Sequence, residues 1–522
     1  MWSSVRRINL PLTHKENYMG VKMGSRVLEI TFFLTVLIVI PGIAIGASEQ
    51  SADEMLQLAE NAVKDGNYEH AYNLFMNASE KFAALGNEAE KKDALRQAKR
   101  MSWLFAEMNL NRTSADETIQ EAFPQFTQEE REAFLEPGAS IQFESDGQIY
   151  YYEGIARNIR FHNASLSQNY TRSLGESPFF DQISPFISAP RDKKNPLYLN
   201  HTFQGTGELS IPRNLLPDNG TLQVWYPLPV SIESQSDILV TSVQPEEYVV
   251  SEPVTTGDIG EVYLEIPLEK MMDDYVNVSV RLTFTTSPRI LDLDPDAIPV
   301  YDTSDPLYQR YTKSQPNINV TPEIMALANQ IVGDETNPYK KARLIYDYIL
   351  QTLPYSNVPH AYLTAMSIPE SEFVHYTGFG DCGTQSTYFA ALCRAVGIPA
   401  RAPGGYQIVP GHQGTHFWAE FYLPEYGWIP VDVTVADAAD WAYNATPEQV
   451  TEYKDFFFGN LDPYRFTIQT DVDEPFSGEP NPDILFTAVH QNPSVVCTSS
   501  DSDVEMLGMI YSTYTFEDLT PE

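Results

Sequence analysis

The segment from Gly378 to Arg401 constrains the fold more than any other part of this sequence. Its glycines end the preceding loop, and the residues between them predict a helix that begins at Cys382 and stops at Gly397. One face of this helix is apolar at the i, i+3, i+4, i+7 spacing of a buried stripe. The stripe consists of Phe389, Leu392, Cys393 and Val396. The sequence therefore predicts a helix packed into a core.

The two cysteines of this helix have different predicted roles. Cys393 lies on the apolar stripe and is predicted to be a core thiol. Cys382 opens the helix, where the positive end of the helix dipole and free backbone N–H groups favour a thiolate. The same N–H groups can stabilise an oxyanion that forms beside the sulfur. Cys382 is therefore the candidate nucleophile.

A base, and a group to orient it, are offered by two predicted strands. The first strand carries His416 and Trp418 on one face, and the second, after a short loop, carries Asp432. His416 and Asp432 share a face only if that loop has an odd length of about three or five residues, with Gly427 at positive φ. A loop of even length would separate the two side chains.

This order of Cys, His and Asp, with the nucleophile on a helix and its partners on adjacent strands, resembles the transglutaminase-like superfamily of papain-like enzymes. The resemblance covers about residues 305–470. It rests on the motifs Gly-Asp-Cys382, Leu-Cys-Arg394-Ala-Val-Gly-Ile-Pro-Ala-Arg401, Gly405-Tyr406, His416-Phe-Trp-Ala-Glu420, Gly427-Trp-Ile-Pro-Val-Asp432 and Phe458-Gly-Asn-Leu-Asp-Pro-Tyr-Arg465.

The resemblance implies a role for each matching residue. Cys382 would be the nucleophile, His416 the base and then the acid, and Asp432 the group that orients the imidazole. Trp418 and Trp428 would form the walls of the cleft. The backbone N–H of Cys382 would supply one oxyanion donor.

The remaining site residues are expectations of the same kind. Tyr355 is the expected second oxyanion donor, and Val433 stands where a proline often follows the aspartate in this family. A metal site built from Cys382, His412 and His416 would lack a second cysteine at ligand spacing. No metal and no cofactor is therefore expected.

The patterns outside this core predict a multidomain α+β chain. Short alternating runs separated by turn residues predict a β-sandwich. These runs are Gly207–Ile211, Gly220–Tyr226, Ile238–Val243, Glu261–Ile266 and Val276–Phe284. The expected order is a signal peptide or membrane anchor (1–47), a helical module (48–136), an irregular connecting segment (137–200), the sandwich (201–290), the papain-like catalytic domain of helices and antiparallel sheet (305–470) and an acidic tail (471–522). This tail is expected to be poorly ordered after Asp483.

The helical module resembles one tetratricopeptide-type repeat. The matching positions are Ala59, Ala62, Gly66, Tyr68, Ala71, Phe75 and Ala78. One repeat is too few for a solenoid, so the module is expected to be a helical hairpin. It would serve either as a binding site for a protein partner or as a plain helical spacer.

The first 50 residues indicate export. Basic residues precede an apolar run from Ile30 to Ala47, and acidic residues follow at once. This pattern is typical of a signal peptide, or of an uncleaved anchor with its basic end inside, and Met19 or Met23 could be the start. Nine Asn-x-Ser/Thr sequons agree with an extracytoplasmic protein, either secreted or tethered to the membrane.

Charge and cysteine content exclude some classes of function. The 522 residues carry a formal net charge of −38, and no basic stripe offsets it, so nucleic acid is not an expected partner. Only three cysteines are present, so the fold must depend on its cores rather than on disulfides. Cys497 could be free or could pair with Cys393, but a buried position on the helix stripe disfavours that pairing.

The chemistry that a Cys-His-Asp triad predicts is acyl transfer on peptide or protein amide bonds. Water as the second nucleophile gives a cysteine peptidase or amidase, which is the favoured interpretation. A lysine amine would give a cross-linking transglutaminase. The third hypothesis is a non-catalytic binding or assembly protein of the cell surface.

Overall fold

The computed structural model describes residues 50–163, 165–169, 178–189, 199–440, 446–476, 484–498 and 503–520. The chain divides into two compact units, Met1–Glu49 and Gln50–Glu522, and all described residues belong to the second. The predicted signal peptide or anchor at 1–47 lies outside the described residues. Within the described part, no helix is long and apolar enough to cross a membrane.

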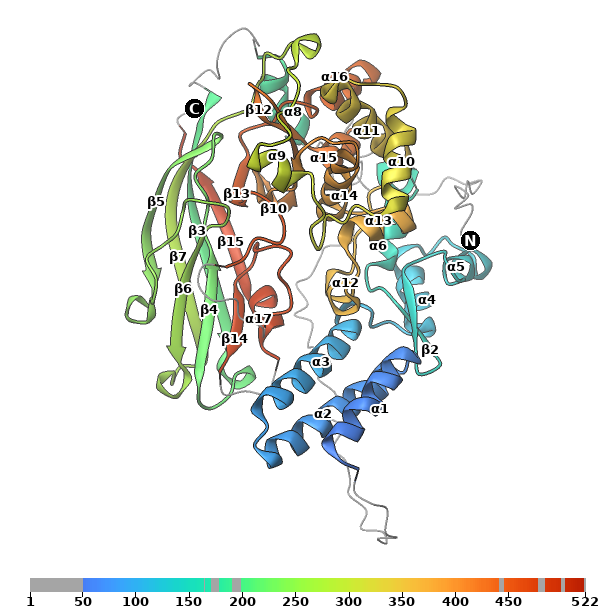
Figure 1. The fold of residues 1–522 in the computed structure, drawn as a ribbon, viewed down its shortest axis with the longest axis vertical. Coiled ribbons are helices and arrows are strands. Elements are labelled where there is room, and N and C mark those ends of the chain that lie inside the picture. The colour runs from blue at the N-terminus through green and yellow to red at the C-terminus, as the bar shows by residue number, and fades with distance from the viewer. Residues whose placement is uncertain are drawn as a thin grey trace. The chain divides into compact units, whose positions relative to one another are not determined.

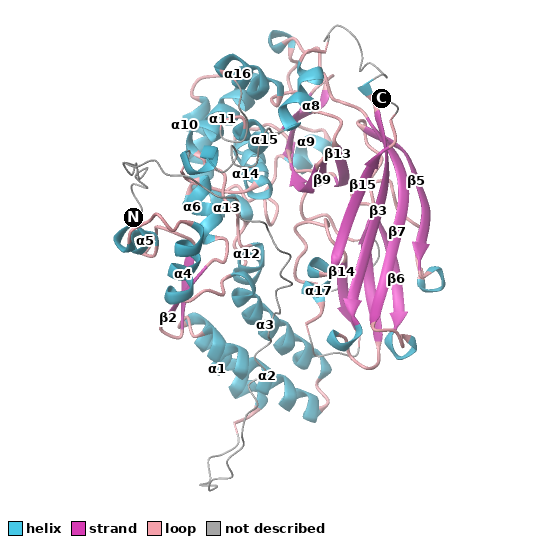
Figure 2. Ribbon diagram, turned by 180° about the vertical axis from the view of Figure 1, so that it is seen from behind, coloured by secondary structure: helices cyan, strands magenta, loops and turns pink. Residues whose placement is uncertain are grey.

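The β-sandwich consists of two antiparallel sheets (Figures 1 and 2). The larger has the order β15-β3-β7-β5, with strands Ser512–Asp518, His201–Pro212, Tyr275–Thr286 and Gln235–Gln244. The smaller has the order β14-β4-β6, with strands Ser494–Cys497, Thr221–Pro227 and Glu261–Pro267. Alternate residues of β3 and β7 are buried, as expected for strands with one face in a core. The five strands predicted from the sequence are confirmed.

The prediction of a poorly ordered tail after Asp483 is wrong for the described residues of that range. β14 pairs with β4, and β15 pairs with β3, so the end of the chain completes both sheets. The short helix α17 (Glu505–Ile510) lies between these strands. Alternation in β15 buries Tyr514 and Phe516, and the acidic residues that follow, Glu517 and Asp518, obscured that pattern in the sequence.

The N-terminal module is helical, as predicted. Helices α1 (Ala52–Lys64) and α2 (Tyr68–Leu85) form a hairpin in which Ala59, Ala71 and Ala78 are completely buried. The helices that follow are α3 (Glu88–Glu107), α4 (Arg112–Ala122) and α5 (Gln128–Phe134). Helix α3 packs against α12 (His360–Met366), which belongs to the predicted catalytic region.

The connecting segment is more regular than predicted. It contains a hairpin of β1 (Gln142–Ser145) and β2 (Gln148–Tyr151), followed by α6 (Ile155–Phe161) and α8 (Pro178–Ile187). Asn158 of α6 donates a hydrogen bond to the carbonyl of Asn357 and accepts one from its N–H. This segment therefore packs against the loop that leads to α12.

Helix α14 (Cys382–Ala395) lies at the centre of the predicted catalytic region, and every residue from Gly383 to Arg394 is buried. The helices of this region are α9 (Pro306–Tyr311), α10 (Pro322–Val332), α11 (Pro338–Thr352), α13 (Glu370–Thr377), α15 (Val433–Ala438) and α16 (Pro447–Phe456). One small sheet has the order β10-β9-β13, with strands His412–Phe417, Gly404–Val409 and Arg465–Gln469. The other has the order β12-β11-β8, with strands Gly427–Val431, Ala419–Leu423 and Ala400–Arg401. One hydrophobic cluster runs from the sandwich into this region.

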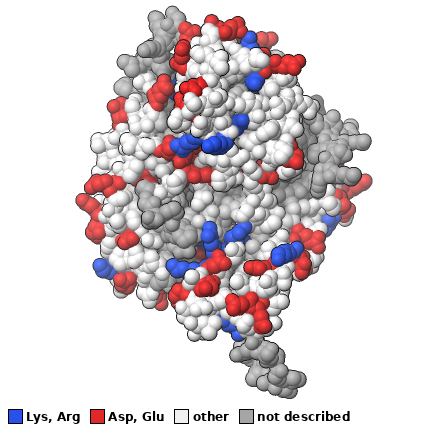
Figure 3. All heavy atoms as spheres, in the orientation of Figure 1, with Lys and Arg blue, Asp and Glu red and all other residues white. Residues whose placement is uncertain are grey.

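The surface is strongly acidic. On the face drawn in Figure 3, Asp and Glu side chains are spread widely, whereas Lys and Arg form small groups. This distribution agrees with the formal net charge of −38. A field of this sign repels other polyanions.

Candidate active site

The first turn of α14 carries the predicted nucleophile. Asp381 is the N-cap and accepts a hydrogen bond from the N–H of Thr384 at 3.0 Å, while Thr384 Oγ1 accepts one from the N–H of Asp381 at 2.9 Å. This reciprocal cap fixes Cys382 as the first helical residue, with its side chain partly exposed. Gly380 leads into the cap and has no room for a side chain, because a Cβ there would lie 2.4 Å from Thr384 Oγ1.

His416 and Asp432 meet as the odd-loop argument predicted. His416 Nε2 lies 2.8 Å from Asp432 Oδ2, and both side chains are buried. Leu423 pairs with Gly427, so the loop between β11 and β12 consists of the three residues 424–426, and Gly427 has a φ of +77°. The predicted register is therefore confirmed.

The strands around this pair differ from the prediction. His416 belongs to β10, which pairs with β9, and the chain changes sheets at Trp418 before β11 begins. Asp432 follows the last residue of β12 and is the N-cap of α15, where it accepts a hydrogen bond from the N–H of Val435 at 3.0 Å. Both side chains are thus held at element ends rather than within one continuous hairpin.

A buried arginine that the sequence analysis did not identify as a site residue completes this group. Arg465 Nη1 donates to Asp432 Oδ2 at 2.6 Å, and Arg465 Nη2 donates to Asp462 Oδ2 at 2.6 Å. Burial opposes the ionisation of Asp432, yet the charges of His416 and Arg465 lower its pKa to about 2. Asp432 is therefore a carboxylate at neutral pH, positioned to hold an imidazole or imidazolium.

The environment of the Cys382 thiol corrects the expectation from the helix dipole. Burial and the nearby charge of Asp381 raise the pKa of Cys382, although hydrogen bonds from the N–H groups of Phe417 and Gly383 lower it in part. The N-cap carboxylate of Asp381 already occupies the positive end of α14. The helix dipole favours a thiolate at Cys382, and this neighbouring charge opposes it.

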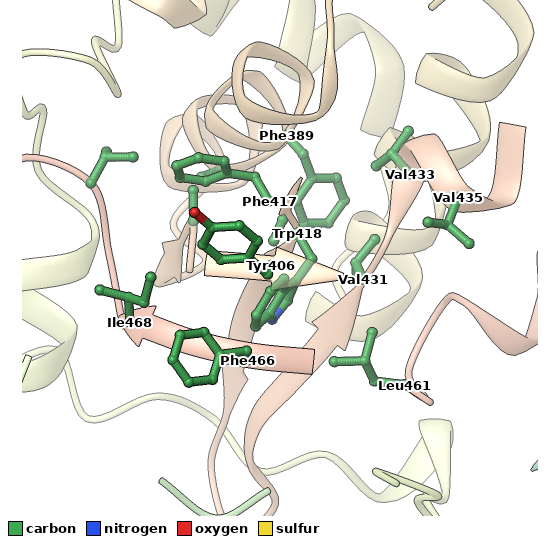
Figure 4. Packing of buried hydrophobic residues seen from close by; sticks show 14 of the residues in the cluster. Phe389, Tyr406, Phe417, Trp418, Val431, Val433, Val435, Leu461, Phe466 and Ile468 are labelled. Carbon is green, nitrogen blue, oxygen red and sulfur yellow. The ribbon is translucent and has the colours of Figure 1, made fainter. Parts of the chain in front are cut away.

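The three other predicted site residues have different positions. The backbone of Tyr355 forms an isolated β-bridge with Gly380. Burial, and the nearby Cys382, raise the pKa of the Tyr355 phenol, so Tyr355 lies close to Cys382. Trp418 is only 1% exposed and packs among the buried hydrophobic residues of Figure 4. Its ring centroid lies 6.5 Å from that of His416, so Trp418 supports the His416 ring from within the core.

Trp428 does not join the triad. It lies near the far end of β12 from Asp432, and its ring packs 4.0 Å from the guanidinium of Arg401 and 4.8 Å from the Tyr311 ring. These contacts form a cation–π and aromatic cluster on another part of the core. The expectation that Trp428 forms a wall of the cleft stays a prediction.

A second cluster behind the nucleophile was not predicted either. His360 lies between Asp381, 2.7 Å from its Nε2, and Glu370, 2.9 Å from its Nδ1. These residues belong to three consecutive elements, and nothing in their spacing marks them as neighbours in the fold.

The other cysteines and His412 lie outside the site. Cys393 and Cys497 are both buried, and no disulfide joins them. His412 is exposed on β10. Among the described residues, no group of three His, Cys, Asp or Glu side chains could hold a metal ion.

Comparison with known proteins assigns the central region. Residues 325–433 match the family model described as the transglutaminase-like superfamily. Over 260 residues the chain is 26% identical to an uncharacterized protein of Haemophilus influenzae. This aligned region covers 44% of this chain and 68% of that protein. Over 91 residues it is 34% identical to a protein-glutamine gamma-glutamyltransferase of Pseudomonas aeruginosa, covering 16% of this chain and 12% of that protein. The solved structure of a provisionally assigned cysteine protease from Cytophaga hutchinsonii is 18% identical, covers 62% of this chain and 92% of its own, and has a TM-score of 0.38.

Proposed function

Because residues 325–433 form a transglutaminase-like core domain, we propose that this chain is a thiol-dependent acyl-transfer enzyme acting on amide bonds of peptides or proteins. Cys382 is the nucleophile, His416 the base and then the acid, and Asp432 the orienting group. The observation that carries the proposal is the 2.8 Å contact between His416 Nε2 and Asp432 Oδ2. With Nε2 engaged, Nδ1 is the nitrogen available to accept the thiol proton.

The reaction proceeds through a thioester. The sulfur of Cys382 attacks the amide carbonyl carbon while its proton passes to His416 Nδ1, and the oxyanion is stabilised by backbone N–H groups at the start of α14. The tetrahedral intermediate then breaks its C–N bond, and His416 returns the proton to the leaving amine. Asp432 keeps the imidazole in one orientation and stabilises its charged form.

The fate of the thioester divides two enzyme classes, and hydrolysis is the one we propose. Water attacks the thioester carbonyl while His416 takes one of its protons, the C–S bond breaks, and His416 returns that proton to the Cys382 sulfur. The acid product releases the second proton of the water to solvent as it becomes a carboxylate. Cross-linking is the alternative, and the short match to a protein-glutamine gamma-glutamyltransferase favours it. The two differ only in whether water or an amine reaches the same intermediate.

The test uses the full chain and a library of quenched fluorescent peptides. Cys382→Ala should remove turnover, and His416→Ala should lower kcat/KM roughly a thousandfold or more. Adding a dansylated alkylamine separates the outcomes, since a transferase would attach the amine to the acyl product and a hydrolase would release the acid. If no peptide is turned over and Cys382 is alkylated no faster than an ordinary exposed thiol, the enzymatic function is contradicted, and a non-catalytic binding or assembly role takes its place.

We also propose that the chain acts outside the cytoplasm, either secreted or anchored by its N-terminal segment. The support is the basic flank and the apolar run from Ile30 to Ala47. N-terminal sequencing of the protein from isolated membranes and from the medium would test this. Recovery from the cytosol alone, with an intact N-terminus, would contradict it.

A further inference from the structure

The group directly behind the nucleophile is an imidazole between two carboxylates. His360 is the first residue of α12, and its Nε2 lies 2.7 Å from Asp381 Oδ2 while its Nδ1 lies 2.9 Å from Glu370 Oε1. The other oxygen of Asp381 accepts the N–H of Thr384 and so caps α14. The ring of His360 therefore contacts the side chain of Asp381, the residue that directly precedes Cys382.

Two acceptors on one ring define its protonation state. Ionised carboxylates only accept hydrogen bonds, so both nitrogens of His360 must donate, and an imidazole that donates from both nitrogens is the charged form. Burial acts to lower the pKa of His360, but the charge of Asp381 and the hydrogen bonds to Asp381 and Glu370 raise it well above the ordinary value. Glu370 is 3% exposed, and the side chain of His360 is 27% exposed, so solvent reaches the ring.

The groups that face His360 come from every element packed around it. Asp381 precedes α14, Glu370 begins α13, and Glu107 at the end of α3 accepts the N–H of Ala361 at 2.7 Å. The ring of Phe486 lies 6.5 Å from the imidazole ring and carries no charge. These three carboxylates favour the protonated form of His360, whereas Arg100 of α3 donates to the carbonyl of Ala365, near the other end of α12.

We propose that protonated His360 is a positioning residue for the reaction proposed above: its imidazolium holds Asp381 as the cap of α14 and offsets the carboxylate charge beside the Cys382 sulfur. The inference rests on the proposed function, since it concerns formation of the Cys382 thiolate. His360 does not touch the substrate and acts through Asp381. Loss of its proton, or of the ring, leaves a negative charge next to a sulfur that must itself become negative.

The size and sign of the effect follow from this geometry. A charge a few ångströms from an ionisable group shifts the pKa of that group by about one unit or more. If the charge of Asp381 is no longer offset, the pKa of Cys382 rises by about that amount, and its thiolate population at a given pH falls about tenfold. His360→Gln should therefore slow the reaction of Cys382 about tenfold at pH 7 and move its pH profile upward. Asp381→Asn should have the opposite effect, because an asparagine still caps a helix but carries no charge.

The experiment measures alkylation of Cys382 by iodoacetamide in the full chain from pH 5 to 10, followed by peptide mass spectrometry. The variants are His360→Gln, Asp381→Asn, the double variant and His375→Gln, a matched control whose ring contacts the Tyr388 hydroxyl instead of the cluster. His360→Gln should lose its effect when combined with Asp381→Asn, and the control should match wild type. A wild-type profile for His360→Gln, or an equal loss in both backgrounds, overturns the inference.

Two further comparisons keep the outcomes separable. If His360→Gln does not fold, as judged by circular dichroism, Asp381→Asn decides alone: alkylation slower than wild type at pH 7 contradicts the proposal. His416→Ala reports on the proposed function itself. If wild type and His416→Ala alkylate at the same rate, the triad fails; if they differ but His360→Gln has no effect, only the role of His360 fails.

Discussion

Arg465 and His416 donate to the same oxygen, Asp432 Oδ2, at 2.6 and 2.8 Å. The carboxylate is buried completely, and its other oxygen accepts the N–H of Val435. Asp432 is therefore stabilised as an anion from several directions before any substrate binds. The role of Arg465 is to keep that charge in place in a region without solvent.

Removing this cation should destabilise the fold. Arg465→Met leaves the buried carboxylates of Asp432 and Asp462 without the cation that they share, and we expect a loss of about 3–5 kcal/mol in the free energy of unfolding. Urea unfolding followed by circular dichroism measures it. Arg343→Met is the control, because the Arg343 side chain is 36% exposed and its ion pairs should contribute much less. Equal losses for the two variants would contradict the prediction.

The lowered pKa of Asp432 predicts a pH dependence of stability. A carboxylate whose folded pKa is about 2, below the ordinary 3.8, contributes stability that is fully present above pH 4 and is lost as the pH falls toward 2. The contribution is about 2 kcal/mol. The difference in unfolding free energy between wild type and Asp432→Asn should shrink over that range. A constant difference from pH 7 to 2.5 would argue against it.

Gly380 should be intolerant of a side chain for a local reason. An added Cβ would meet Thr384 Oγ1 at 2.4 Å and Val374 Cγ2 at 2.9 Å, which would displace the cap that fixes Cys382. We expect Gly380→Ala to lower the alkylation rate of Cys382 at least tenfold. Gly414→Ala, two residues from His416 and with open space around it, should be neutral. If Cys382 is alkylated at the wild-type rate in both alanine variants, the prediction that a Cβ at Gly380 displaces the cap is contradicted.

Deletion of β15 should destabilise the β-sandwich as well as remove the end of the chain. Without residues 499–522, β3 loses its partner β15, and the buried rings of Tyr514 and Phe516 leave the core. We expect rapid digestion of the sandwich in limited proteolysis, whereas removal of residues 521–522 alone should leave the digestion pattern unchanged. A truncated protein that resists protease like the full chain would contradict this.

The sequence predicted the nucleophile helix, the sandwich strands and the pairing of His416 with Asp432, because each depends on local periodicity or on one hairpin. The odd-loop argument needed only Gly427 and the alternation of two strands. The same argument did not predict the sheet change at Trp418, since a continuous strand and an interrupted one have the same alternation.

The charged groups could not be predicted in the same way. Arg465 is 33 residues from Asp432, and His360 is 21 residues from Asp381, so their contacts depend on how distant elements pack. For the same reason, the raised pKa of Cys382 was missed: the dipole can be inferred from a helix start, but the compensating carboxylate cannot. The tail was missed because composition outweighed a seven-residue alternation in Ser512–Asp518.

The pairing of β15 with β3 also determines when the protein can finish folding. These strands are about 300 residues apart in the chain, and the catalytic region is synthesised between them. β15 must therefore be synthesised before the larger sheet can acquire its edge strand, and such distant pairing is slow. The chain thus delays closure of its sandwich until after the catalytic region has been made, which would leave an exposed sheet edge for chaperones to protect during synthesis.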